Sequence, residues 1–231
     1  EKKYELKGRL PDMFESAMNI LENDLTYAFY RAIAYLKPEV ANRLYDNVEL
    51  VSRNLAGIRK NGLVKRLESS FYAFQVSINN FSKANQYMIK MFEDNKIFIA
   101  PDLDIKTLLE NNSVEEIEEK ILAKAIENPK NAVFKANDFR PEYLVMLYKD
   151  QRILDSMVKD WKDIKDDDDS KFLVFNELLK HEFFKLDRNP NQKLVVFSES
   201  FDTIQYLKRR INRDDVLVVS AKNRNTQFKT I

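Results

Sequence analysis

Apolar side chains recur at intervals of three and four residues through most of the first 165 positions of the chain. This spacing places them on one face of an α-helix and predicts a helical array over residues 11–165. Prolines and the pair Asn61-Gly62 mark the expected breaks, because a proline pushes the preceding residue out of helical geometry. The expected helices cover residues 11–37, 39 to about 60, 63 to about 94, two shorter stretches within 103–128, and 140 to about 165.

The helix expected from residue 63 has the most regular apolar face. It carries Leu63, Leu67, Phe71 and Phe74 at helical spacing. We therefore assign the two phenylalanines to a core stripe and not to base stacking. After this helix, the apolar run 96–100 has the length of a strand.

A capping box marks the start of one short helix. Ser113 and Glu116 stand three residues apart before an apolar periodic stretch. In such a pair each side chain binds a free backbone amide of the other residue, which fixes the helix start.

The pattern changes after residue 165. Asp166–Asp169 is a run of four carboxylates, which we interpret as a linker that also caps a helix expected at 171–185. The same run could hold a hard cation, but successive residues cannot all point at one ion, so the linker is preferred.

Two segments near the carboxyl end each contain four consecutive apolar residues, Lys193–Ser198 and Val216–Ser220. Such runs are typical of strands buried on both faces of a parallel sheet. An amphipathic helix is expected between them, over 201–211, and a further helix opening over 225–231. Strand, helix and strand predict a parallel βαβ unit with a right-handed crossover.

The predicted fold class is mainly α with a partial α/β part at the carboxyl end. We expect a helical domain at 1–165 and a truncated second domain at 166–231. Two buried parallel strands need cover on both faces and edges. Either the helical part covers them or residues outside this chain complete the sheet. We favour truncation, and the start at Glu1, without an initiator methionine, agrees with it.

Composition excludes several kinds of site. The 38 basic and 37 acidic residues nearly cancel, so no global basic field favours nucleic acid. The chain has no cysteine, which removes disulfides and thiolate chemistry and fits a reduced, cytoplasmic setting. His181 is the single histidine, which excludes a multi-histidine metal site, and we expect it at the surface.

The three glycines do not form a phosphate-binding loop. Gly57 and Gly62 are five residues apart, but Leu63 follows where such a loop needs lysine. No apolar run approaches the length of a membrane span, and the first residues lack the apolar core of a signal peptide.

Two segments resemble a known family. Lys193–Leu207 reads KLVVFSESFDTIQYL and follows a helix that begins near Asp169-Ser170-Lys171, while Leu63–Ser70 reads LVKRLESS and precedes Ala73-Phe74. These segments resemble superfamily 2 helicases, most closely bacterial Swi/Snf-related members. There the first segment opens the second RecA-like domain, and the second lies on a helix between the two motor domains.

The resemblance implies a helical insertion followed by an incomplete parallel βαβ RecA-like lobe. The nucleotide-binding loop, the Asp-Glu-x-His box and the arginine-bearing Gln-x-x-Gly-Arg-x-x-Arg motif of the family are missing from this chain. The resemblance therefore assigns ATP chemistry to no residue here.

The candidate site lies at the carboxyl ends of the two predicted strands, where open α/β sheets meet their ligands. These ends carry Ser198, Ser200, Lys222 and Arg224. Hydroxyls and amides at a helix start suit a phosphate, and the basic residues add charge. The resemblance implies that the loop after the first predicted strand, which carries Ser198 and Ser200, corresponds to the family's fourth motif, which contacts the nucleic-acid backbone. Alternatively, Ser200 only caps the following helix and the basic residues are solvated.

Two other basic groups could contact phosphate. Lys65 and Arg66 stand on the helix from residue 63, and ordinary surface charge on an amphipathic helix is the preferred interpretation for them. The triplet Lys208–Arg210 is interpreted as the solvated face of a covering helix.

Two functions are expected, of different classes. The preferred one is a piece of an ATP-driven helicase or translocase that moves on or remodels DNA or RNA. Its expected partners are nucleic acid, with duplex DNA preferred, and the missing first RecA-like domain; no membrane is expected. This segment should hold no catalytic residue, cofactor or metal, whereas ATP and Mg are expected for the parent protein. The alternative is a non-enzymatic helical interaction module with a small α/β cap.

Overall fold

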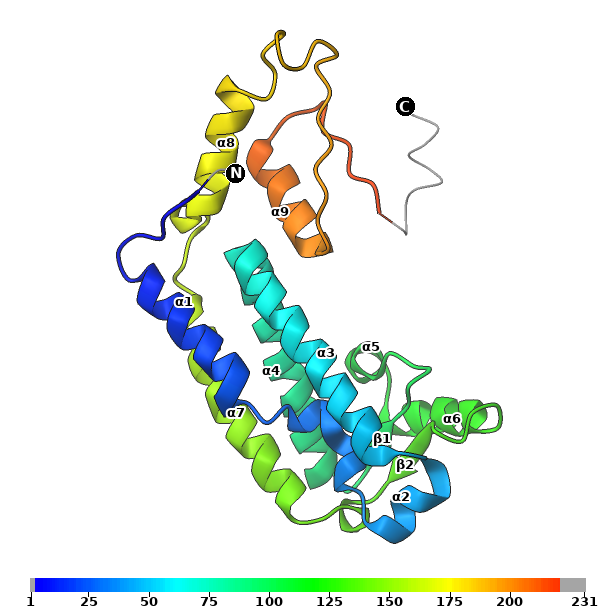
Figure 1. Ribbon diagram of the computed structural model, residues 1–231. Helices are drawn as coiled ribbons and strands as arrows, with labels where there is room; N and C mark the ends of the chain where they lie inside the picture. Colours follow the sequence, from blue (N-terminus) through cyan, green and yellow to red (C-terminus); the bar gives the residue numbers. More distant parts are fainter. Residues whose placement is uncertain (1–2, 221–231) are drawn as a thin grey trace. The chain divides into compact units, whose positions relative to one another are not determined.

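The computed structural model describes residues 3–220 and is mostly helical (Figure 1). The chain divides into two compact units. We call the described parts of Glu1–Met18, Leu63–Ser77 and Asp160–Ile231 the terminal unit, and Asn19–Gly62 with Ile78–Lys159 the central unit. The predicted domain boundary at residues 165 and 166 stays a prediction.

The predicted helical array is confirmed. The α-helices are α1 (Leu10–Asn19), α2 (Pro38–Leu44), α3 (Val48–Ser69), α4 (Phe71–Glu93), α5 (Ile105–Asn111), α6 (Val114–Ala125), α7 (Glu142–Trp161), α8 (Ser170–His181) and α9 (Phe201–Ile211). Shorter turns are a π-helix at Ile20–Asp24 and 3-10 helices at Ala28–Tyr35, Ala136–Asp138 and Asp166–Asp168.

Several helix boundaries differ from the predicted ones: the helix expected from 39 to about 60 is split into α2 and α3 after Leu44, and the one expected at 171–185 ends at His181. The helix expected at 11–37 ends after the π-helix, because Tyr27 has a left-handed φ of 55° and starts the 3-10 turn. Asn61-Gly62 does not break α3, which runs on to Ser69. The break falls instead at Ser70, whose hydroxyl accepts a hydrogen bond from the Ala73 amide at the start of α4.

A large hydrophobic cluster of the central unit surrounds its two strands. β1 (Ile97–Ile99), in the apolar run predicted at strand length, pairs antiparallel with β2 (Ala132–Phe134), with Phe98 opposite Val133. Phe92, Phe139 and Tyr143 pack in this cluster with ring centroids 5.0–5.4 Å apart. The predicted capping box of Ser113 and Glu116 is present at the start of α6.

The terminal unit gathers the end of α3, the start of α4, and α8 and α9. Phe71 and Phe74 pack edge-on against Trp161, with centroids 5.4 and 4.9 Å away. Both phenylalanines are buried, so the interpretation as core residues is confirmed. The Gln75 amide donates to the backbone oxygen of Ile164 at 2.9 Å, which fastens the segment after α7 to α4.

The predicted parallel βαβ lobe is wrong for this structure. α9 forms over the predicted residues, but 193–198 and 216–220 are not strands. Within residues 3–220 the strands are β1 and β2 alone, and they pair antiparallel. Phe197 is 91% exposed and Val195 is 71% exposed, so 193–198 lacks the covering layer of a buried strand, whereas Val218 in 216–220 is buried. The helix opening predicted at 225–231 lies outside the described residues.

Candidate functional site

The loop before α9 contains both candidate serines, and both take part in a local turn. The Ser200 hydroxyl accepts a hydrogen bond from the Thr203 amide at 3.3 Å and so caps α9. The Ser200 amide in turn donates to the Ser198 hydroxyl at 3.2 Å. The capping role of Ser200 is therefore observed, and a nucleic-acid contact of the two serines stays a prediction.

Lys65, near the end of α3, lies beside this loop. Its Nζ is 2.7 Å from Glu199 Oε2, and the two side chains are 62% and 76% exposed. The next residue, Arg66, is half-buried. Lys222 and Arg224 lie outside the described residues. The structure thus brings one predicted basic residue to the loop of the predicted serines, although Glu199 opposes its charge.

α9 packs on the junction of α3 and α4 along one line of contacts. The hydroxyls of Ser69 and Thr203 are 3.2 Å apart. One helical turn further, the rings of Tyr72 and Tyr206 stack with centroids 5.6 Å apart and planes 15° apart. The two segments that carry the family resemblance therefore contact each other within the terminal unit.

Tyr206 also joins α9 to α8, which lie side by side (Figure 1). Its ring meets Phe172 edge-on at 5.6 Å, and its hydroxyl donates to the Asp166 backbone oxygen at 3.5 Å. Asp169 caps α8 by accepting from the Phe172 amide at 3.0 Å. Burial raises the pKa of both the Tyr206 hydroxyl and the Asp169 carboxyl. The predicted capping by the acidic run is thus confirmed for Asp169.

The remaining acids of the run have partners that the sequence did not reveal. Asp166 Oδ2 lies 2.9 Å from Arg209 and 3.9 Å from Arg210. Asp167 Oδ1 lies 2.9 Å from the Arg210 guanidinium. Asp168 accepts from the Lys165 amide at 2.8 Å. Lys208 and Arg209 are exposed, as a solvated face requires, but Arg209 and Arg210 also carry ion pairs to the acidic run, which the sequence did not predict.

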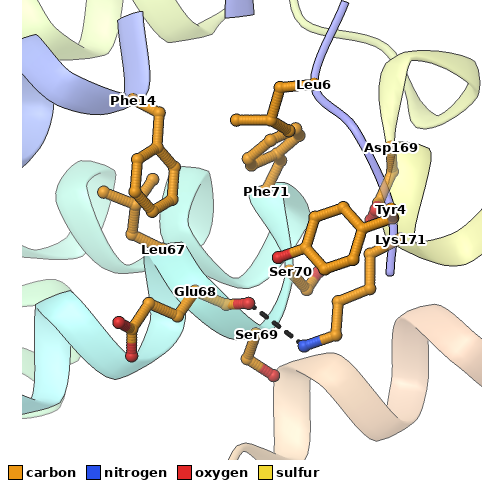
Figure 2. A pocket seen from close by; sticks show the side chains of 10 residues that line it. All are labelled: Tyr4, Leu6, Phe14, Leu67, Glu68, Ser69, Ser70, Phe71, Asp169 and Lys171. Atoms are coloured by element: carbon orange, nitrogen blue, oxygen red, sulfur yellow. Dashed lines mark hydrogen bonds between the residues drawn. The ribbon is translucent and has the colours of Figure 1, made fainter. Parts of the chain in front are cut away.

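A small pocket of the terminal unit lies beside these contacts (Figure 2). Its cavity volume is about 10 Å³, and it is partly open to solvent. Tyr4, Phe71 and Asp169 point towards it, and the Lys171 ammonium crosses its rim to donate to the Glu68 backbone oxygen at 3.1 Å. Ligand pockets are usually larger than this, so we assign it no ligand.

No family model matches this chain, and comparison with curated proteins and with solved structures gave no match either. Among residues 3–220, no helix combines the length and the apolar character needed to cross a bilayer. No group of three potential metal ligands occurs in the same residues. His181 is exposed, as predicted, and lies 3.4 Å from Glu177 on its own helix.

Proposed function

We propose that this chain is part of a nucleic-acid-dependent ATPase of superfamily 2, of the bacterial Swi/Snf-related type. In this proposal residues 1–165 form a helical insertion between two motor domains, and residues 166–231 open the second RecA-like domain. The parent protein would couple ATP hydrolysis to movement on duplex DNA, in a cytoplasmic setting. The chain itself would hydrolyse no ATP, because its residues lack a nucleotide-binding loop.

One observation carries the proposal. The two segments with the resemblance, Leu63–Ser70 and Lys193–Leu207, stand more than 120 residues apart in the sequence. They meet through the ion pair of Lys65 and Glu199 and the contact of Ser69 with Thr203. A chance likeness in two separate segments does not require them to pack together, whereas parts of one motor core do.

Exposed apolar side chains support the idea of an unfinished sheet. Phe197, Val195 and Val219 are 91%, 71% and 41% exposed in segments that flank a well-capped helix. Burial of such side chains is the main favourable term in folding. We propose that 193–198 and 216–220 become neighbouring parallel strands when further strands and covering helices border them.

The candidate nucleic-acid contacts in this proposal are the loop of Ser198 and Ser200 together with Lys65 and Arg66. Lys222 and Arg224 belong to the same proposal by their place in the sequence. Phosphate contacts of this kind position a duplex without reading its bases. ATP and Mg would bind in parts of the parent protein that carry the missing motifs.

The test uses the full-length product of the gene that encodes this chain. ATP hydrolysis is measured alone, with duplex DNA and with RNA of equal length. We expect hydrolysis that duplex DNA stimulates, and loss of part of this stimulation in Lys65→Glu. A full-length product without nucleic-acid-stimulated hydrolysis, or a gene without helicase motifs on either side of this segment, overturns the proposal.

A helical interaction module is the second candidate function. α3 leaves Val51, Leu55 and Ile58 exposed at helical spacing, at 40%, 46% and 70%. An exposed apolar stripe of this kind suits a protein partner. A gene whose coding sequence starts and stops at the ends of this segment would favour it.

A further inference from the structure

A single carboxylate oxygen lies between two guanidinium groups in the terminal unit. Asp166 Oδ2 is 2.9 Å from Arg209 Nη2 and 3.9 Å from Arg210 Nη1. Asp167 adds a second carboxylate, 2.9 Å from Arg210 Nη2. An oxyanion held between arginines is the arrangement in which proteins bind phosphate groups.

Aromatic rings hold both guanidinium groups in place. Arg209 lies 4.6 Å above the Tyr72 ring, and Arg210 lies 4.6 Å above the Phe172 ring. Tyr72 and Phe172 both pack against the buried ring of Tyr206. The two arginines therefore keep their positions through stacking even if their acidic partners move away.

We propose that Arg209 and Arg210 form a binding site for a backbone phosphate of duplex DNA, and that Asp166 and Asp167 close this site by taking the place of the phosphate oxygens. The choice of DNA as the occupant rests on the proposed function. The site itself rests on the geometry of the four charged side chains. DNA would displace the acidic run, and the run would compete with DNA for the same donors.

Exposure makes this exchange feasible. The side chains of Asp167 and Arg209 are 85% and 50% exposed, and those of Asp166 and Arg210 are 34% and 21% exposed. Ion pairs with a partner this exposed to solvent contribute little to stability. A phosphodiester offers both guanidinium groups charged oxygens and releases counterions from the duplex as it binds.

The decisive variant of the 231-residue chain is Asp166→Asn with Asp167→Asn. Binding to a fluorescent duplex is measured by anisotropy over a series of salt concentrations. We expect the variant to bind about three- to tenfold more tightly than the wild type at low salt. The slope of log K against log salt should become steeper by about 1 to 2, since each freed arginine adds a phosphate contact.

The matched control is Asp163→Asn with Asp187→Asn. It changes the net charge equally, but both carboxylates are exposed and neither is bonded to an arginine of the site. We expect a much smaller gain in affinity. Adding Arg209→Gln and Arg210→Gln to the first variant should abolish its gain. Equal gains in both double variants, or a gain that survives loss of the arginines, overturn the site.

A single Asp167→Asn variant gives a second measurement in case the double variant misfolds. It should fold normally, because the Asp167 side chain is the most exposed of the four. It should bind DNA about twofold more tightly, with an unchanged melting temperature. No gain from a folded Asp167→Asn chain, together with none from the double variant, overturns the proposal.

A displacement experiment distinguishes DNA from free phosphate as the ligand of this site. Inorganic phosphate should displace DNA from the double variant no better than chloride at equal ionic strength. Much stronger displacement by phosphate assigns the site to a small anion and overturns DNA as its occupant. DNA-stimulated hydrolysis by the full-length product is measured separately. Absence of this hydrolysis would contradict the proposed function but not the phosphate site, and absence of the gain in DNA binding would contradict the site but not the proposed function.

Discussion

The Asp150 carboxylate, in the middle of α7, accepts hydrogen bonds from the Thr26 amide at 2.8 Å and the Thr26 hydroxyl at 3.0 Å. It also accepts from the Ala28 amide at 2.9 Å, and Asp150 is fully buried. These bonds satisfy the free amides where the 3-10 helix Ala28–Tyr35 begins. Asp150, 124 positions after Thr26, thus fixes the first turn of this 3-10 helix.

Asp150→Ala should destabilise the central unit. The substitution leaves the buried Ala28 amide and the partly buried Thr26 amide without this acceptor and opens a small void, which costs about 2–4 kcal/mol. Urea unfolding followed by circular dichroism measures the loss. Asp94→Ala is the matched control, since Asp94 is exposed, and it should change the unfolding free energy by less than about 0.5 kcal/mol. Equal effects of the two substitutions would show that Asp150 does not hold this turn.

Titration of Asp150 should also change how the free energy of unfolding depends on pH. Burial raises the pKa of its carboxyl above the ordinary 3.8, although the hydrogen bonds from Thr26 and Ala28 oppose this rise. The folded chain therefore binds more protons than the unfolded chain just above pH 3.8, and this group's contribution to stability falls as the pH rises through that window.

The comparison with Asp150→Asn isolates this group, because the buried Asp169 titrates in both proteins. We expect the wild type to lose stability relative to Asp150→Asn between about pH 3 and pH 6. Unfolding free energies at a series of pH values measure the difference. A difference that stays constant, or grows in favour of the wild type with rising pH, contradicts a raised pKa.

Local signals in the sequence predicted local structure well. α9 starts after Ser200 as predicted, because its cap and apolar stripe lie within one short segment. The capping box at Ser113 formed for the same reason. The break near Tyr27 could not be predicted, because the acceptor that stabilises it stands on α7. The pairing of Asp166 with Arg209 could not be predicted either. The acidic run and the basic triplet are each visible in the sequence, but nothing in the sequence shows that they lie side by side.

The prediction of two strands near the carboxyl end was wrong for a different physical reason. Lys193–Ser198 has the composition of a buried strand, but a strand forms only beside another strand. In residues 3–220 no neighbour pairs with it, and Phe197 stays exposed. Composition alone predicts what a segment would do in a complete sheet, not whether the sheet is present.

Ser200→Ala should loosen the first turn of α9. The hydroxyl that accepts from the Thr203 amide is lost, at a cost of about 1 kcal/mol for an N-cap serine. Hydrogen exchange of the Thr203 amide should become roughly fivefold faster if this turn opens locally. Ser77→Ala, in the middle of α4, is the control and should leave that amide unchanged. Unaltered exchange in Ser200→Ala would mean that α9 does not depend on this cap.

Lys65→Ala should weaken DNA binding without weakening the fold. The ion pair with Glu199 is exposed on both sides, so its loss should change the unfolding free energy by less than about 0.5 kcal/mol. Loss of one phosphate contact should lower the slope of log K against log salt by about 0.9. Lys90→Ala removes the same charge from an exposed position on α4 and should leave the slope unchanged. The same slope change in both variants would assign the effect to net charge.

Phe197→Asp distinguishes an unfinished sheet from a complete fold. In the 231-residue chain this side chain is 91% exposed, so the substitution should change the unfolding free energy by less than about 0.5 kcal/mol. In the full-length product the same position would lie inside a parallel sheet, where an unpaired carboxylate costs about 3 kcal/mol or more. Leu186→Asp, at a position 70% exposed outside the predicted strands, is the control and should be tolerated in both proteins. Thermal melting of the four variants and of the two unsubstituted proteins measures the contrast. A full-length product that tolerates Phe197→Asp as well as Leu186→Asp would show that Lys193–Ser198 is not a buried strand there, and the RecA-like lobe would have to be abandoned.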